Sequence, residues 1–190
     1  MKFVQKEFSS VYEEKKSKFY AFLAPYSEFK DVMKRLKDEH PKARHFVYAY
    51  RYLNEFDQII ENSSDDGEPK GTSGKPCLNV LAGNELINSF VIVVRYFGGV
   101  KLGTGGLVRA YSDAVNSAIN ISQLELYQKL ELRSLECDYK ELSKLEYIIK
   151  NSNINIINKE FDTKVNLQLE STKEDFSIFE KKLPLDVKIQ

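Results

Sequence analysis

The sequence predicts an α+β protein of two domains, and three observations support this class. Hydrophobic patterns with the periods of strands and of helices both recur along the 190 residues, which indicates that both kinds of element occur in one chain. All nine glycines lie between Gly67 and Gly106. After about residue 124 the composition shifts toward Asn, Ile, Lys and Leu. We therefore expect a first domain over 1–124 and a second over 125–190.

The first domain is expected to begin with a strand, a helix and a hairpin. Residues 19–24 are rich in aromatic side chains and end at Pro25, which predicts a strand. A helix should follow, because Ser27 can serve as its N-cap and apolar residues then recur with helical spacing. Residues 46–53 alternate as in a strand. We expect the hairpin partner of this strand to end at Ile59–Ile60.

Three further elements surround the glycines. A short helix is expected over 77–81, directly after Pro76. Residues 90–94 are apolar at every position, which predicts a strand buried on both faces. A longer helix should follow, with Thr104 as its N-cap. The residues expected on its buried face are Leu107, Ala110, Tyr111, Ala114, Val115, Ala118 and Ile119.

The second domain shows a regular succession of short elements. The pattern predicts a strand at 130–137, a helix around 142–149, strands at 154–161 and 164–170, a helix around 176–179, and a strand at 183–190. The order βαββαβ over about 65 residues is that of the ferredoxin-like plait. We therefore expect this fold for the second domain.

Composition excludes several classes of protein. Lys plus Arg equals Asp plus Glu at 28 each, so the overall charge does not indicate a nucleic-acid partner. The longest aliphatic or aromatic run, residues 90–94, is far too short to span a membrane, and the first residues do not resemble a secretory signal. Cys77 and Cys137 have no spacing typical of a disulfide or zinc site. We expect a reduced, cytoplasmic protein without metal, cofactor or membrane partner.

Two glycine clusters mark the candidate site, because glycine allows positive φ and close approach to the backbone. The first cluster lies in an acidic segment, residues 65–76. The second, residues 95–107, connects the buried strand to the long helix. A glycine loop at a helix N-terminus is suited to binding an anion. Residues 70–110 also carry five cationic side chains against one acidic one, although a solvated basic face would give the same count.

The phosphate-binding motifs of nucleotide-binding proteins are absent from the second cluster. Gly98 and Gly103 have the spacing of the start of a Walker loop, but Thr104 stands where the lysine is required. Val108 stands where a dinucleotide fingerprint needs its third glycine. A weaker contact with an anion or an RNA phosphate stays open. So does a purely structural role, in which the glycines let the helix pack closely on the sheet.

The acidic segment and the histidines allow more than one interpretation. Asp65, Asp66 and Glu68 could bind a metal or act as acid and base, but their spacing is not that of an EF-hand and no histidine pair accompanies them. His45 could belong to a site or make a hydrogen bond in the core. The alternating aromatic residues of 46–53 are expected in the core rather than in a surface for stacking bases.

Four motifs, in this order along the chain, resemble the signatures of the Impact/YigZ family. They are Lys16–Phe19, Ala43–Arg51, Asp65–Pro76 and Arg95–Tyr111. The resemblance implies that the first domain has the fold of the second domain of a small-subunit ribosomal protein, which also occurs in a translation elongation factor. It implies that the second domain is like the last domain of that factor. No catalytic residue is implied.

The resemblance also suggests a biological context. The eukaryotic members of the family are translational regulators that compete for the activator of a starvation-responsive initiation-factor kinase. They use a different N-terminal domain, so that partner is not carried over to this chain. For bacterial members, binding to nucleic acid or to the ribosome is the usual inference.

The sequence therefore leaves two main functional hypotheses, besides a plain protein-protein regulator. The first is a non-enzymatic cytoplasmic factor linked to regulation of translation, which binds RNA, the ribosome or a translation protein. The alternative is an enzyme acting on a phosphorylated or anionic small molecule, with Asp65, Asp66 and Glu68 as its base or metal ligands. The alternative requires the two glycine loops to meet in space. The binding residues expected for the first hypothesis are Arg44, His45, Arg95, Lys101, Gly103, Thr104, Gly105, Gly106 and Arg109.

Overall fold

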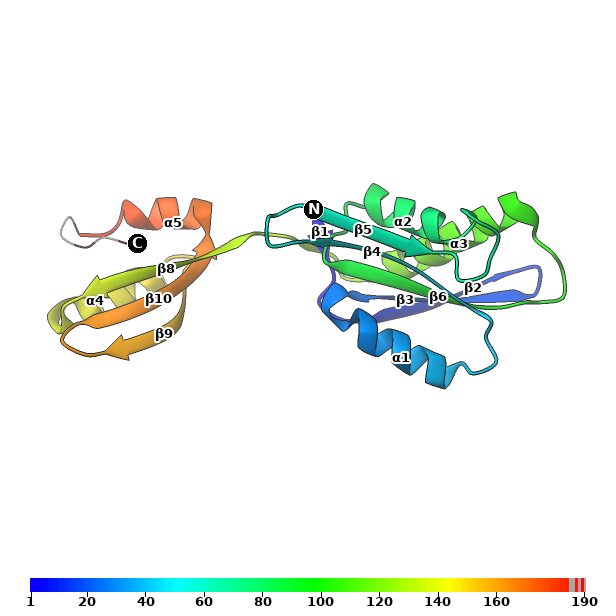
Figure 1. The fold of residues 1–190 in the computed structure, drawn as a ribbon. Coiled ribbons are helices and arrows are strands. Elements are labelled where there is room, and N and C mark those ends of the chain that lie inside the picture. The colour runs from blue at the N-terminus through cyan, green and yellow to red at the C-terminus, as the bar shows by residue number, and fades with distance from the viewer. Residues whose placement is uncertain (185–186, 188, 190) are drawn as a thin grey trace. The chain divides into compact units, whose positions relative to one another are not determined.

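The computed structural model describes residues 1–184, 187 and 189 (Figure 1). It divides into two compact units, Met1–Tyr127 and Gln128–Gln190. The boundary expected from the sequence lies three residues earlier, between 124 and 125. Each unit combines helices with antiparallel strands. The predicted α+β class with two domains is therefore confirmed.

The first unit is built on a five-stranded antiparallel sheet with its most apolar strand at the centre. The spatial order of the strands is β2 (Phe8–Glu14), β3 (Ser17–Pro25), β6 (Ser89–Tyr96), β4 (His45–Leu53) and β5 (Ile59–Ser64). A second pairing joins β1 (Lys2–Phe3) to β7 (Glu125–Leu126).

Helices cover both faces of this sheet (Figure 1). Helix α1 (Phe29–Glu39) follows the short 3₁₀ helix η1 (Tyr26–Glu28) on one face, and α2 (Gly74–Gly83) and α3 (Gly103–Asn120) lie on the other. The side chains of β6 alternate between the two cores and are buried in both. All seven residues expected on the buried face of α3 are buried. The two-sided burial of the central strand is thus confirmed.

Several local expectations are wrong. Ser27 lies inside η1 and does not cap α1. Thr104 lies in the first turn of α3, because the helix begins one residue earlier, at Gly103, whose φ is +71°. Ile59 begins its strand rather than ending it. Strand β2 was not expected; it lies at the sheet edge, where alternate residues stay exposed and the apolar signal is weak.

The second unit forms a three-stranded antiparallel sheet in the order β8–β10–β9 with both helices packed on one face. Its elements are β8 (Leu130–Cys137), α4 (Tyr139–Lys150), β9 (Asn155–Phe161), β10 (Val165–Thr172) and α5 (Lys173–Glu180). This order and succession match a ferredoxin-like plait. The strand expected at 183–190 falls partly outside the described residues, and within them Ile189 forms an antiparallel bridge with Leu135.

None of the helices in the described residues is long and apolar enough to cross a membrane.

Candidate functional site

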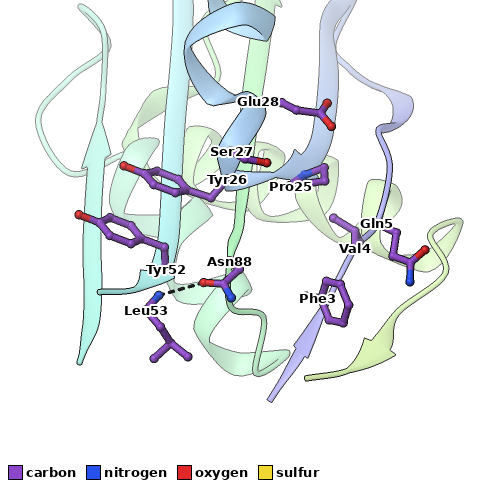
Figure 2. A pocket seen from close by; sticks show the side chains of 10 residues that line it. All are labelled: Phe3, Val4, Gln5, Pro25, Tyr26, Ser27, Glu28, Tyr52, Leu53 and Asn88. Carbon is purple, nitrogen blue, oxygen red and sulfur yellow. Dashed lines mark hydrogen bonds between the residues drawn. The ribbon is translucent and has the colours of Figure 1, made fainter. Parts of the chain in front are cut away.

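A cavity of about 660 Å³ lies away from the glycine loops. Figure 2 shows the rings of Tyr26 and Tyr52 stacked on one side, Phe3 on the other, and Asn88 between them. Asn88 accepts a hydrogen bond from the backbone N–H of Leu53. The lining is mostly apolar and aromatic and contains no cationic side chain. The glycine loops lie at the opposite end of β6, so this cavity is separate from the site predicted from the sequence.

Asp65 organises the acidic loop rather than facing a ligand. Its carboxylate accepts hydrogen bonds from the N–H groups of Gly71, Ser73 and Gly74, at 2.7, 3.1 and 2.8 Å, and from the hydroxyl of Ser73 at 2.8 Å. Burial alone would raise the pKa of this carboxyl, but the four donors together lower it. Asp65 therefore fixes the loop and the first turn of α2.

Asp66 and His45 connect the acidic loop to β4. The Asp66 carboxylate accepts a hydrogen bond from the N–H of Phe46 at 2.6 Å, and the Asp66 carbonyl contacts His45 Nδ1 at 2.8 Å. A carbonyl can only accept, so Nδ1 carries the hydrogen and donates it. His45 Nε2 is therefore the ring nitrogen left for another partner.

Glu68 joins the two glycine loops through a buried network. Its Oε1 atom accepts hydrogen bonds from Arg95 Nη1 at 2.5 Å and from the Tyr111 hydroxyl at 2.9 Å. The side chains of Glu68 and Arg95 are 4% and 7% exposed. Burial, followed by the nearby Glu68 charge, raises the pKa of Tyr111 far above its ordinary value. The acidic loop, β6 and α3 are thus joined inside the domain by one buried network of an ion pair and a hydrogen bond.

Arg95 is only partly satisfied by this network. Its Nε atom is buried and has no hydrogen-bond partner among the described residues. Its guanidinium lies over the rings of Phe19 and Phe97, 5.4 and 5.7 Å from their centroids. Phe19 and His45 are the direct neighbours of Arg95 on the two adjacent strands. An unpaired buried N–H is costly, so this donor is an exception among the buried polar groups of the domain.

The second glycine loop is held against the turn between β2 and β3. A Cβ on Gly98 would lie 2.0 Å from the carbonyl carbon of Lys16, so no other residue fits there without moving backbone. The N–H of Gly98 also donates to the hydroxyl of Ser17 at 3.1 Å. The turn itself has positive φ at Lys15 and Lys16, of 47° and 64°. The Lys16 motif singled out in the sequence therefore supports the glycine loop directly.

The loop ends at the first turn of α3, whose N–H groups have no acceptor within the helix. Within the described part of the chain, no side chain makes a capping hydrogen bond at this end of the helix. Gly103, Thr104 and Gly105 are exposed, and a Cβ on Gly103 or Gly105 would meet nothing within 4 Å. The N–H groups and the partial positive charge of this helix end are thus accessible to an anion.

These parts enclose a cavity of about 430 Å³, which we call the glycine-loop cavity. Three cationic side chains and one carboxylate line it, and an adjacent cavity of about 290 Å³ adds Lys42. The residues lining the glycine-loop cavity are Arg44, His45, Glu68, Pro69, Arg95, Phe97, Lys101, Leu102, Gly103, Thr104 and Leu107. The two glycine loops therefore meet, as the enzyme hypothesis requires.

Not every expected site residue lines this cavity. Arg44, His45, Arg95, Lys101, Gly103, Thr104 and Glu68 do, whereas Gly105, Gly106, Arg109, Asp65 and Asp66 do not. Glu68 is the single carboxylate among the described lining residues, and it is engaged by Arg95 and Tyr111. The described residues also bring together no group of three His, Cys, Asp or Glu side chains able to hold a metal ion. Phe97 and Lys42 were not expected in the sequence.

The profile of the Impact N-terminal domain matches residues 15–119, which include both glycine loops and α3. This chain belongs to the Impact family. A second profile, described as a domain of unknown function (DUF1949), matches residues 135–184 of the second unit. The suspected membership in the family is confirmed.

Similarity to relatives covers most of the length of this Impact-family chain. It is 38% identical over 175 residues to an IMPACT family member of Haemophilus influenzae, covering 88% of this chain and 85% of the relative. It is 38% identical over 164 residues to the IMPACT family member YigZ of Escherichia coli, covering 84% and 79%. A crystal structure of a protein described as hypothetical is similar with a TM-score of 0.71 at 32% identity, covering 99% and 95%. Both domains are therefore shared with these relatives.

Proposed function

We propose that this Impact-family protein is a non-enzymatic factor that binds RNA through its phosphates at the glycine-loop cavity and acts in the regulation of translation. One observation carries the binding proposal. Arg95 lines a cationic cavity, is buried and fixed by Glu68, and its Nε has no hydrogen-bond partner among the described residues. Arginine donors of this kind recognise phosphate oxygens with defined geometry.

The surroundings of Arg95 suit a phosphate better than a neutral ligand. The first turn of α3 lines the cavity together with Lys101, and Arg44 lines it as well. Within the part of the chain that the structure describes, neither Arg44 nor Lys101 takes part in an ion pair, and both are exposed. Cations without partners around an accessible helix N-terminus favour binding of an anion.

The cationic surface is broader than a single small anion needs. Lys42 extends it along the adjacent cavity, and Lys16 lies in the turn packed against Gly98. A chain of phosphates would contact several of these side chains together, with affinity that depends on salt. The link to translation comes from the Impact family, whose eukaryotic members are translational regulators.

Charge reversal on the cavity rim tests this proposal. The double variant Arg44→Glu/Lys101→Glu should bind a labelled RNA oligonucleotide at least tenfold more weakly in fluorescence anisotropy. Its affinity should also depend less on salt, with the log–log slope reduced by about 0.7 for each lost phosphate contact. The control is Lys30→Glu/Lys37→Glu, the same change of charge on α1, across the sheet. Equal effects of the two double variants, or binding by the unmutated protein that is insensitive to salt, would contradict the proposal.

A further inference from the structure

Phe97 is the one exposed aromatic side chain that lines both cavities around Arg95, within the described residues. It follows the central strand directly and is 58% exposed. A single exposed apolar residue is ordinary on a protein surface. Its position beside a cationic cavity requires an explanation. The groups proposed to bind phosphate would work equally well if this ring were buried, so they do not account for its exposure.

We propose that Phe97 is a stacking platform for an unpaired base, so that the cavity binds single-stranded RNA in preference to duplex RNA or a simple anion. The inference rests on the proposed function, because it identifies the form of RNA that the phosphate site takes. It also assigns a role to a residue outside the set of phosphate-binding groups.

The placement of the ring relative to Arg95 supports this role. The Arg95 guanidinium lies 5.7 Å from the centroid of Phe97, while its other aromatic contact, Phe19, is fully buried. Arg95 therefore contacts the Phe97 ring and still leaves more than half of that side chain in solvent. A nucleotide carries its phosphate and its base on one ribose, so a phosphate at Arg95 brings a base within reach of the Phe97 ring.

The combination of an exposed ring with cations is typical of proteins that bind single strands. Bases of a duplex are stacked on one another and cannot reach a protein ring, whereas an unpaired base can stack on it. Phe56 provides the contrast within this chain. It is 72% exposed, but it lies in the turn between β4 and β5 beside Glu55 and Asp57, where a phosphate would be repelled.

Substitution at Phe97 tests the inference directly. Phe97→Ala should weaken binding of a single-stranded oligonucleotide about five- to hundredfold, the loss typical of one stacked base. The slope of affinity against salt should stay unchanged, because no phosphate contact is removed. Phe56→Ala, which also removes an exposed phenylalanine, should bind as the unmutated protein does. Circular dichroism should show both variants folded, since both side chains are largely in solvent.

A second variant reports stacking itself. The chain has no tryptophan, so Phe97→Trp places a single tryptophan at the proposed platform, and its emission can be excited separately from that of the tyrosines. Its emission should be quenched by single-stranded RNA, while inorganic polyphosphate, which has no bases, should bind at the same cations without quenching. An oligonucleotide lacking bases should bind the unmutated protein and Phe97→Ala equally well.

The outcomes separate the two proposals. Salt-dependent RNA binding with no loss in Phe97→Ala and no quenching in Phe97→Trp overturns the stacking role alone. Absence of binding to both RNA and polyphosphate overturns the phosphate site and the stacking role together. Preference for duplex over single-stranded RNA also contradicts the inference, whatever the behaviour of the cationic rim.

Discussion

Removal of the Glu68 carboxylate should destabilise the first domain severely. Glu68→Ala leaves the Arg95 guanidinium, 7% exposed, without its counter-charge. Loss of one partner of a buried ion pair costs about 3–5 kcal/mol. The buried Tyr111 hydroxyl loses its acceptor as well, but this cost overlaps with the first because the three groups share one network. A loss of about 3–5 kcal/mol is a large part of the total stability of a domain, about 5–15 kcal/mol.

The matched control is a carboxylate of the same type on the surface. Glu39→Ala removes the pair with Arg35, at 3.4 Å with side chains 49% and 41% exposed, and should cost about 0.5 kcal/mol or less. Urea unfolding gives the free energy of unfolding, and hydrogen exchange at the amides of β6 assigns the loss to the first domain. Glu68→Gln, which keeps an acceptor for Tyr111, should fall between the two. If Glu68→Ala costs no more than Glu39→Ala, the description of a buried, coupled network is refuted.

Three further predictions concern the loops and the response to pH. Gly98→Ala should cost about 1–3 kcal/mol because its Cβ meets the Lys16 backbone, whereas Gly83→Ala, with open space, should stay within about 1 kcal/mol of the unmutated protein in thermal unfolding. The lowered pKa of Asp65 contributes stability above pH about 4, and this stability is lost as the pH falls through the folded-state pKa. In urea unfolding at a series of pH values, Asp65→Asn should reduce the decrease of the free energy of unfolding at acid pH. Burial and two neighbouring tyrosines raise the pKa of Tyr26 to about 12, so its contribution should disappear between pH about 10 and about 12, and Tyr26→Phe should reduce that alkaline loss. An unchanged pH profile in either variant contradicts the corresponding assignment.

Periodicity predicted most of the fold because burial imposes it. The long helix illustrates this best, since each of its seven expected core residues is buried. Residues 90–94 were recognised as the central strand because only a strand covered on both faces is apolar throughout. The helix starts were wrong, because neither Ser27 nor Thr104 makes the capping hydrogen bond that its residue type favours. Local preference was overridden there by η1 and by the positive φ of Gly103.

The site was predicted in outline but not in its contacts. Glycine content located both loops, and the cationic residues that follow them were expected. The sequence could not show that Glu68, Arg95 and Tyr111 share one network, because their contact depends on how the acidic loop packs over the sheet. For the same reason Asp65 and Asp66 were expected to act with Glu68, although the fold uses them to tie the loop to α2 and β4. An aromatic residue after a buried strand also gives no sign that it points into solvent.

In the proposed function, Arg95 contributes both to the stability of the first domain and to the binding of a phosphate. An arginine kept only for stability would direct its remaining donors to carbonyls or water, since an unpaired buried N–H costs about 1–3 kcal/mol. Here Glu68 neutralises one edge of the guanidinium and fixes its orientation, while Nε faces no acceptor among the described residues. Residues that fix such a group at the cost of stability are typical of binding sites. In the proposed function the acidic loop does not contact the phosphate itself; its Glu68 holds Arg95 at the wall of the glycine-loop cavity.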